Sequence, residues 1–297
     1  MAGYTSVLRQ GDDAVQTVSE LVPLRDAVST LKRDGALALV PTMGALHEGH
    51  LTLVREAQQR AAHVAVSIFV NPRQFGANED LDAYPRQLAR DSALLEAEGV
   101  SLLWAPSAGA MYPAGYATNV SVSGISEGLC GAARPGHFDG VATVVCKLFN
   151  QVQPDLALFG EKDWQQLAVI RAMARDLDLT LPHVGAIIGV PTVREADGLA
   201  MSSRNAYLTP QQRADAAALP RGMRWLIENV VKGQPIAEAL LELEENLLAG
   251  GFGSIDYAKV CDAASLEELA TLGDRPARLL VAARIGKTRL IDNMAVG

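Results

Sequence analysis

The chain has 297 residues, of which 49% are hydrophobic and 20% are charged, a composition typical of a soluble globular protein with room for two domains. Its formal net charge of −8 argues against a general nucleic-acid-binding role, because proteins of that class present a positively charged face. The start of the chain lacks the apolar core of a secretory signal, no apolar run has the length of a membrane span, and the three cysteines are far apart, so we expect a cytoplasmic protein with free thiols.

The first two-thirds of the sequence alternates short apolar runs with amphipathic segments of helix length. The short runs are apolar throughout, as is typical of strands that are buried on both faces. This alternation predicts an α/β fold, a Rossmann-like parallel sheet with helices on both faces, whose ligands bind at the carboxyl ends of the strands. The predicted strands are 36–40, 64–70, 100–104, 155–159 and 184–190, and the predicted helices are 49–62, 86–98, 141–151 and 164–177.

After residue 191 the pattern changes to two helical stretches followed by strands with short loops. We therefore expect a Rossmann-like domain at 1–191 that binds the ligands, followed by a smaller α+β lid domain at 192–297. The predicted helices of this second part are 210–231 and 235–248, and its predicted strands are 254–261, 277–285 and 288–293.

The first candidate loop, PTMGALHEGH at 41–50, follows a predicted strand and opens a predicted helix. A helix N-terminus offers free N–H groups and partial positive charge, which suit a phosphate group. His47 and His50 project to one side of such a helix, while Gly44 and Gly49 let a ligand approach the backbone. A lone histidine is usually a satisfied surface or core residue, but this pair in this context indicates a nucleotide site. Zinc is a separate alternative, although in HEGH the second histidine falls one residue early for the HExxH metal motif.

The second candidate loop, SIFVNPRQFG at 67–76, lies at the end of another predicted strand. A loop glutamine is ordinarily just solvated, but at this position the amide of Gln74 can hold both a hydroxyl and a carboxylate. Residues 76–86 are polar and flanked by Gly and Pro, which is typical of a gate that closes over substrate.

The third candidate loop, FGEKDWQQ at 159–166, again follows a predicted strand. Gly160 allows close backbone approach, and Lys162 is a point charge suited to a phosphate. Asp163 can cap the next helix or face a nucleotide or metal, and Gln166 lies one turn into that helix. Taken alone, a bare Glu-Lys-Asp favours a capped helix with an exposed lysine, and the functional interpretation depends on the other two loops.

The segment 190–205 links the two predicted domains and contains Ser202, Ser203 and Arg204 near its end. The hydroxyls can donate to phosphate oxygens, and a guanidinium can bind two oxygens at once. Such a triplet carries little information by itself, but ligand sites concentrate at domain junctions.

The HxGH pattern after the first strand resembles the signature of the nucleotidylyltransferase superfamily, which uses it to hold ATP phosphates. With the full string at 41–50, followed in order by NPRQF, FGEKDWQQ and the segment 201–204, the resemblance narrows to the pantothenate synthetase family and covers essentially the whole chain. The resemblance implies ATP-dependent condensation of pantoate with β-alanine through a pantoyl adenylate, which releases AMP and pyrophosphate. It also implies Mg²⁺ on the phosphates and a homodimer. The connection 179–188 is longer than is usual in the family, which leaves open where the predicted strand 184–190 begins.

The resemblance also assigns roles to the matching residues. The implied catalytic residues are His47, His50, Lys162 and Arg204, with His50 as proton donor to the departing group. Gln74 and Gln166 are implied to hold pantoate and to border the β-alanine site. No metal ligand and no base for the amine are assigned. The implied ATP-binding residues are Met43, Gly44, Ala45, Leu46, His47, Glu48, Gly49, His50, Gly160, Glu161, Lys162, Asp163, Val193, Met201, Ser202, Ser203 and Arg204.

Two rival functions remain at this stage. One is an adenylyl transferase of the same superfamily that acts on a phosphate ester, which predicts basic residues in place of Gln74 and Gln166. The other is a non-catalytic nucleotide sensor, which has no reason to keep both histidines and both glutamines.

Overall fold

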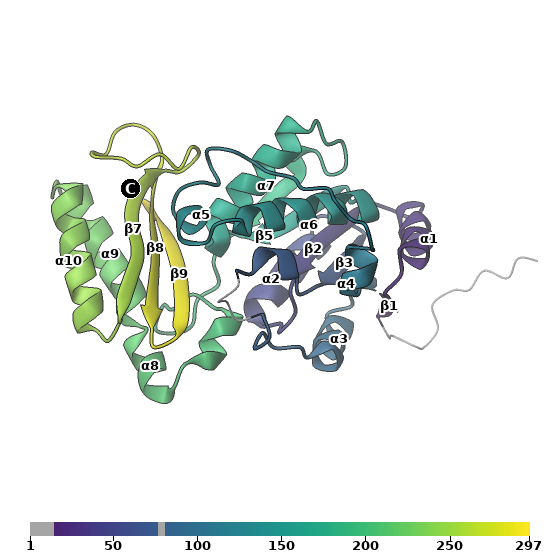
Figure 1. Ribbon diagram of the computed structural model, residues 1–297, viewed down its shortest axis with the longest axis horizontal. Helices are drawn as coiled ribbons and strands as arrows, with labels where there is room; N and C mark the ends of the chain where they lie inside the picture. The colour runs from purple at the N-terminus through teal and green to yellow at the C-terminus, as the bar shows by residue number, and fades with distance from the viewer. Residues whose placement is uncertain (1–14, 77–80) are drawn as a thin grey trace, which may run out of the picture.

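A parallel sheet of six strands forms the centre of the first part of the chain (Figure 1). The computed structural model describes residues 15–76 and 81–297. The strands are β1 (Gln16–Val18), β2 (Leu37–Thr42), β3 (His63–Ile68), β4 (Leu102–Trp104), β5 (Leu156–Gly160) and β6 (Ile187–Val190). They lie in the order β1-β4-β3-β2-β5-β6, and each neighbouring pair is parallel. The chain adds β3 and β4 on one side of β2 and then places β5 on the other side, so the topological switch point lies between β2 and β5.

Helices cover both faces of this sheet, because successive strand residues point to opposite faces and both sets are apolar. Leu37 and Leu39 of β2 pack with the helices of one face, whereas Ala38 and Val40 pack with those of the other. One face carries α1 (Leu21–Lys32), α6 (His137–Val152) and α7 (Trp164–Asp176), and the other carries α2 (Glu48–Gln58) and α3 (Leu88–Ala97). The predicted Rossmann-like sheet with helices on both faces is confirmed.

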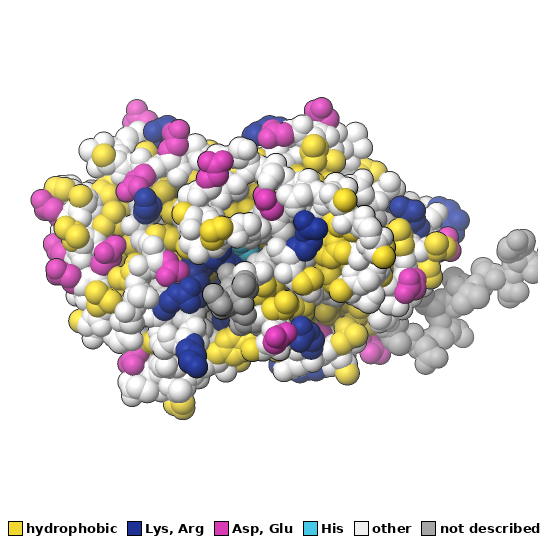
Figure 2. All heavy atoms as spheres, in the orientation of Figure 1, with side chains coloured by type: hydrophobic (Ala, Val, Ile, Leu, Met, Phe, Trp, Pro, Cys, Tyr) yellow, Lys and Arg dark blue, Asp and Glu magenta, His cyan; other side chains and the backbone are white. Residues whose placement is uncertain are grey.

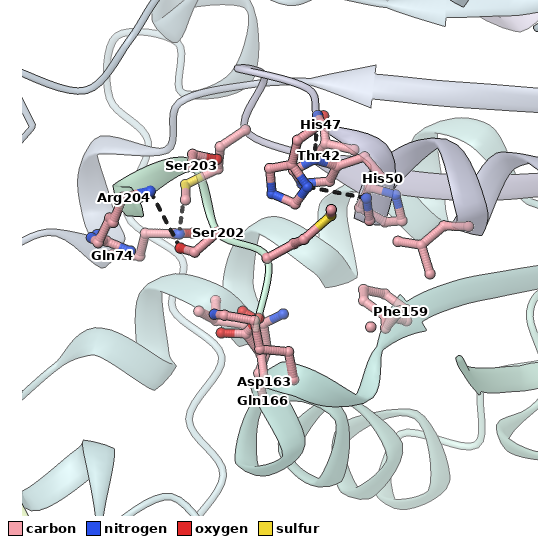
Figure 3. A pocket seen from close by; sticks show the side chains of 18 of the residues that line it. Thr42, His47, His50, Gln74, Phe159, Asp163, Gln166, Ser202, Ser203 and Arg204 are labelled. Carbon is pink, nitrogen blue, oxygen red and sulfur yellow. Dashed lines mark hydrogen bonds and ion pairs between the residues drawn. The ribbon is translucent and has the colours of Figure 1, made fainter. Parts of the chain in front are cut away.

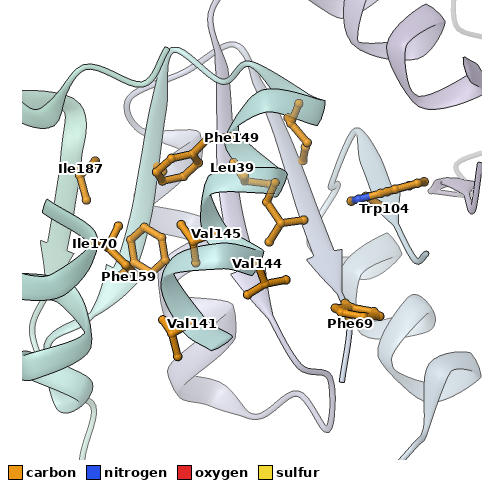
Figure 4. Packing of buried hydrophobic residues seen from close by; sticks show 14 of the residues in the cluster. Leu39, Phe69, Trp104, Val141, Val144, Val145, Phe149, Phe159, Ile170 and Ile187 are labelled. Carbon is orange, nitrogen blue, oxygen red and sulfur yellow. The ribbon is translucent and has the colours of Figure 1, made fainter. Parts of the chain in front are cut away.

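Helix α6 packs against both the sheet and the loop after β3 (Figure 4). Phe149 meets Phe159 of β5 edge-on, with ring centroids 6.3 Å apart. At Gly140 the helix backbone approaches the loop so closely that a Cβ would lie 2.3 Å from the carbonyl oxygen of Arg73. The short elements of this part are η1 (Pro72–Gln74), α4 (Ala108–Met111), α5 (Cys130–Ala133), η2 (Glu161–Asp163) and η3 (Val184–Ala186).

The last part of the chain forms a smaller unit with its own apolar core. Its strands β7 (Ser254–Asp262), β8 (Ala277–Ile285) and β9 (Thr288–Val296) form an antiparallel sheet in chain order. Its helices are η4 (Ser203–Tyr207), α8 (Pro210–Asp215), α9 (Ala218–Val231) and α10 (Ile236–Ala249). Figure 1 shows α9 and α10 on the side of this sheet that faces away from the six-stranded sheet. The predicted smaller α+β unit is confirmed, while the boundary at residue 191 stays a prediction.

Two predicted elements were wrong in their extent, and two elements near the start of the described chain were not predicted. The predicted helix 210–231 is two helices, because the ring of Pro220 excludes a helical carbonyl at Ala216, and the chain turns there. The predicted strand 184–190 begins only at Ile187, because the residues before it form the turn η3, which the His183 side chain caps by accepting the Gly185 N–H at 3.1 Å. The sequence pattern also did not predict β1, a short edge strand, or α1, which lacks a side-chain cap.

Two expectations concern residues that the structure does not describe. Residues 1–14, where we expected no secretory signal, lie outside the described residues. Residues 77–80, which belong to the predicted gate, also lie outside them. Within 15–76 and 81–297, no helix combines the length and apolar character that crossing a membrane requires.

Candidate active site

A cavity opens at the carboxyl ends of β2, β3 and β5, where the predicted loops converge (Figure 3). On the molecular surface, Lys and Arg side chains gather beside a hollow between the two parts of the molecule, and a histidine is visible inside it (Figure 2). The predicted site residues that line the cavity are Met43, His47, Gly49, His50, Gln74, Gly160, Lys162, Asp163, Gln166, Val193, Met201, Ser202, Ser203 and Arg204.

Backbone N–H groups hold both histidine rings in fixed orientations at the start of α2. His47 caps the helix, and its Nδ1 accepts the N–H of Gly49 at 3.2 Å. The Nδ1 of His50 in turn accepts the backbone N–H of His47 at 3.3 Å, and the ring centroids lie 4.1 Å apart. Because each Nδ1 acts as an acceptor, the proton of each neutral ring is assigned to Nε2. Each ring therefore offers one N–H donor.

Burial keeps both histidines neutral at physiological pH. It lowers the pKa of His47 to about 4 and the pKa of His50 to about 3. These values already include smaller effects of neighbours: His47 lowers the pKa of His50, and the ammonium of Lys162 lowers that of both rings. In the ligand-free protein, the imidazoles therefore act as hydrogen-bond donors rather than as cations.

A buried carboxylate bonds the backbone of the turn that precedes the histidines. Asp91 of α3 is buried and accepts the N–H groups of Ala45 at 2.8 Å and of Leu46 at 2.9 Å. Ala45 has a φ of 51°, and the side chain of Leu46 packs in the apolar core. Because these two N–H groups already bond Asp91, the turn fixes the shape of the histidine loop.

Five of the predicted ATP-binding residues lie outside the cavity lining. They are Gly44, Ala45, Leu46, Glu48 and Glu161.

The amide of Gln74 is oriented by a neighbour. Asn71 is buried, and its Nδ2 donates to the Oε1 of Gln74 at 3.1 Å and to the carbonyl oxygen of Gly140 at 3.0 Å. Gln74 also donates one amide N–H to the sulfur of Met43 at 2.9 Å, which leaves its second N–H and one lone pair of its oxygen for a ligand. The expectation that Gln74 holds a hydroxyl and a carboxylate stays a prediction.

An apolar wall was not predicted from the sequence. It consists of Val141, Val144, Val145 and Leu148 of α6 together with Phe69 and Phe159. Their spacing along α6 is that of any helix packed on a sheet, so the sequence carries no signal that separates cavity-lining positions from core positions. Such a surface can receive the apolar part of a small ligand.

The loop after β5 lies across the cavity from the histidines. Lys162 and Asp163 form an ion pair at 3.7 Å. Gln166 lies one turn into α7, and Figure 3 shows it beside Asp163 and opposite His47 and His50. A cation and a neutral amide therefore face two neutral N–H donors across the same space.

The link to the C-terminal unit contributes the remaining polar groups. Ser202 caps η4 by accepting the N–H of Arg204 at 3.3 Å, and Ser203 donates to the carbonyl oxygen of Ala45 at 3.4 Å. The N–H of Met201 donates to the carbonyl oxygen of Val193 at 3.0 Å. Hydrogen bonds within the link and one bond to the histidine loop therefore fix the position of the link.

One described part of the predicted gate also reaches the cavity. Tyr84 is buried, lines the cavity and packs edge-on against Phe75, with ring centroids 5.9 Å apart. The hydroxyl of Tyr207, the last residue of η4, donates to the carbonyl oxygen of Ala83 at 3.3 Å, which connects this segment to η4. The role of residues 76–86 as a gate stays a prediction.

Comparison with known proteins identifies the family. The family model for pantoate-beta-alanine ligase matches residues 15–295. The chain is 69% identical to the pantothenate synthetase of Novosphingobium aromaticivorans, over 95% of this chain and 99% of that protein. It is 59% identical to the pantothenate synthetase of Sphingopyxis alaskensis, over 95% of this chain and 100% of that protein.

Solved structures agree with the sequence comparison. The pantothenate synthetase of Thermus thermophilus superposes with a TM-score of 0.88 at 48% identity, over 95% of this chain and 99% of that one. The pantoate-beta-alanine ligase of Francisella tularensis, solved in complex with beta-gamma ATP and beta-alanine, gives a TM-score of 0.80 at 32% identity, over 95% and 98% of the two chains. The chain belongs to the pantoate-beta-alanine ligase family.

Proposed function

We propose that the chain condenses pantoate with β-alanine in an ATP-dependent ligase reaction that proceeds through a pantoyl adenylate. One observation carries the proposal: donors suited to phosphate and donors suited to a small carboxylate meet in a single cavity at the switch point of the sheet. Family membership supports the substrates, and the Francisella tularensis ligase was solved with beta-gamma ATP and beta-alanine. Family membership also favours a carboxylate as the group that receives AMP, rather than the phosphate ester on which the rival adenylyl transferase would act.

The two steps follow from the chemistry of carboxylates. A carboxylate resists attack by an amine because oxide is a very poor leaving group. In the first step, a carboxylate oxygen of pantoate bonds to the α-phosphorus of ATP, and the bond to the bridging oxygen of pyrophosphate breaks. In the second step, the neutral amine of β-alanine bonds to the acyl carbon, the C–O bond to AMP breaks, and the amine loses a proton. The first step needs positioning and charge stabilisation more than a strong base.

We assign the phosphates to the basic and donor side of the cavity. The Nε2–H groups of His47 and His50, the ammonium of Lys162, and the Ser202–Arg204 segment would donate to phosphate oxygens. Because His50 is neutral in the ligand-free protein, it begins as a hydrogen-bond donor to the departing pyrophosphate. The negative charge of ATP opposes the effect of burial and raises the pKa of both rings, which brings proton donation by His50 within reach.

We assign pantoate to the other side. The NH₂ groups of Gln74 and Gln166 suit its carboxylate and hydroxyl oxygens, and the apolar wall of α6 suits its methyl groups. A neutral amide holds a carboxylate without cancelling its charge, so the oxygen remains nucleophilic.

Magnesium fits as a partner of the phosphates. Among the described residues, no group of three or more His, Cys, Asp or Glu side chains is placed to hold a metal ion. Mg²⁺ in nucleotide sites is commonly held by one or two carboxylates and the phosphates themselves. Asp163, which lines the cavity, would supply such a carboxylate, and the ion would neutralise phosphate charge.

We further propose a cytoplasmic homodimer with a domain boundary between residues 191 and 192. Cys130, Cys146 and Cys261 are free thiols, which persist in reducing compartments. The family resemblance supports the dimer. The buried members of the cores on the two faces of the parallel sheet end at Val190, and those of the C-terminal core begin at Leu199, which supports the boundary.

The proposed reaction predicts a defined set of products. We expect AMP and pyrophosphate in equal amounts when ATP, pantoate and β-alanine are all present. Without β-alanine, pyrophosphate should form in an amount close to that of the enzyme and then slow, because the site shields the anhydride from water. Chromatography of the nucleotides is the measurement. ADP as the product, or turnover that does not require pantoate, would contradict the proposal.

The partly buried, neutral histidines predict a pH dependence of stability. The folded state resists protonation of both rings, whereas in the unfolded chain they bind protons near the ordinary histidine pKa of 6.5, so stability is lost as pH falls below that value. Between about pH 7.5 and pH 5, wild type should lose on the order of 4 kcal/mol more unfolding free energy than the double variant His47→Gln/His50→Gln, about 2 kcal/mol for each ring. Urea unfolding at both pH values measures the difference. An identical pH dependence in both proteins would show that the rings titrate normally.

The assignment of pantoate to the amides predicts selective kinetic losses. Gln74→Ala and Gln166→Ala should each lower kcat/KM for pantoate by roughly 10–150-fold, since a hydrogen bond to a charged group contributes about 1.5–3 kcal/mol. ATP affinity, measured by titration calorimetry, should remain within about twofold. Gln151→Ala is the matched control, because this buried amide of α6 bonds Trp104 outside the cavity. Equal losses for ATP and pantoate would show that the two amides shape the pocket generally.

A further inference from the structure

Two adjacent polar side chains of β9 are buried beside the candidate site, although neither lines the cavity. Asp292 is 2% exposed and Asn293 is 3% exposed. Each bonds a different segment that reaches the proposed phosphate site. Burying an acid and an amide is unfavourable unless their hydrogen bonds are made, so their partners indicate what the pair is for.

Asn293 holds the backbone of the loop that carries Lys162. Its Nδ2 donates to the carbonyl oxygen of Glu161 at 2.9 Å and to that of Lys162 at 2.8 Å. Its Oδ1 accepts a hydrogen bond from the guanidinium of Arg278. Both amide hydrogens and the amide oxygen are therefore used, which fixes the side chain and the two carbonyl groups.

Arg278 explains why an amide rather than a carboxylate suits this position. Its guanidinium carbon lies 3.5 Å from the ring centroid of Trp164, and a guanidinium nitrogen lies 4.0 Å from the carboxylate of Glu161. Arg278 needs an acceptor, whereas the two loop carbonyls need donors. Asparagine offers both, and aspartate would satisfy only the arginine.

Asp292 holds the link that carries the serine–arginine segment. Its carboxylate accepts two hydrogen bonds from Arg194, at 2.7 Å and 2.9 Å. Arg194 also donates to the carbonyl oxygens of Gly198 at 3.0 Å and Asn293 at 3.2 Å. A bridge between Arg194 and Ala200 then brings the chain directly to Met201. Such a bidentate pair fixes direction as well as distance.

We propose that Asp292 and Asn293 are a positioning pair that sets the two phosphate-binding segments relative to each other. Asn293 fixes Lys162 through its backbone, and Asp292 fixes the segment 201–204 through Arg194. Because the two side chains are adjacent on one strand, the C-terminal sheet holds both segments at a defined spacing. The inference rests on the proposed role of Lys162 at the phosphates, and neither residue of the pair touches the substrates.

The test uses two variants of Asn293 in the full chain. Asn293→Asp keeps the acceptor for Arg278 but removes both donors, and Asn293→Leu removes the donors without adding charge. Both should lower kcat/KM for ATP by roughly 10–100-fold, because small misplacements of a positioned group have effects of this size. The KM for pantoate should remain within about twofold. An effect in Asn293→Asp alone would trace to the added charge and would overturn the proposal, as would unchanged kcat/KM for ATP in both.

A matched control separates positioning from stability. Leu290→Ala removes a buried side chain from the same strand, on the side that packs against the core of the C-terminal unit. It should lower the melting temperature and leave kcat/KM for ATP unchanged well below that temperature. A loss in this variant as large as that of Asn293→Leu would assign the effect to general destabilisation and would overturn the proposal.

A double-mutant cycle tests whether Asn293 acts through Lys162. In a Lys162→Ala background, Asn293→Leu should change kcat/KM for ATP by no more than about twofold, because the group it positions is already gone. An undiminished effect in that background would overturn the proposal. Titration of each protein with ATP alone keeps this test separate from the proposed reaction. A wild-type enzyme that binds ATP but makes no AMP from pantoate would refute the reaction. The same cycle, measured on ATP affinity, would still decide whether Asn293 positions Lys162.

Discussion

The chain leaves β2 toward one face of the sheet and leaves β5 toward the other. Helix α2 packs on one face and α7 on the opposite face, although β2 and β5 are neighbours. The loops that follow these two strands must therefore diverge, and a crevice opens between them. The histidine loop forms one wall of the crevice and the Lys162 loop forms the other. The position of the site thus follows from the strand order.

Within the crevice, hydrogen bonds from the protein use acceptor atoms of the site side chains, which leaves N–H groups of the same side chains for the ligand. Backbone N–H groups occupy Nδ1 of His47 and of His50, and Asn71 occupies the oxygen of Gln74. The two rings are then fixed with Nε2–H available, and Gln74 keeps the N–H that does not bond the sulfur of Met43. Substrates whose polar atoms are phosphate and carboxylate oxygens need donors that are oriented in advance, because such donors require no reorganisation during the reaction.

The sequence predicted the sheet and the loops because both depend on local pattern. Continuous apolar runs such as 36–40 indicated strands buried on both faces, and the motifs at their ends indicated where ligands bind. The contacts that orient the site could not be predicted, since they join distant residues: Asp91 bonds Ala45, Asn71 bonds Gly140, and Asn293 bonds Lys162. Such contacts follow from how elements pack, and the local sequence around each residue would be compatible with many other partners.

The central claim is that the carboxylate of pantoate becomes bonded to the α-phosphorus of ATP. Pantoate that carries heavy oxygen in its carboxylate tests the claim directly. If the adenylate forms and the amine then displaces AMP at the acyl carbon, one labelled oxygen must leave with the nucleotide, so mass spectrometry should find the label in the phosphate of AMP. Label in inorganic phosphate, with ADP as the nucleotide product, would show an acyl phosphate instead and would contradict the proposed role of the histidine loop.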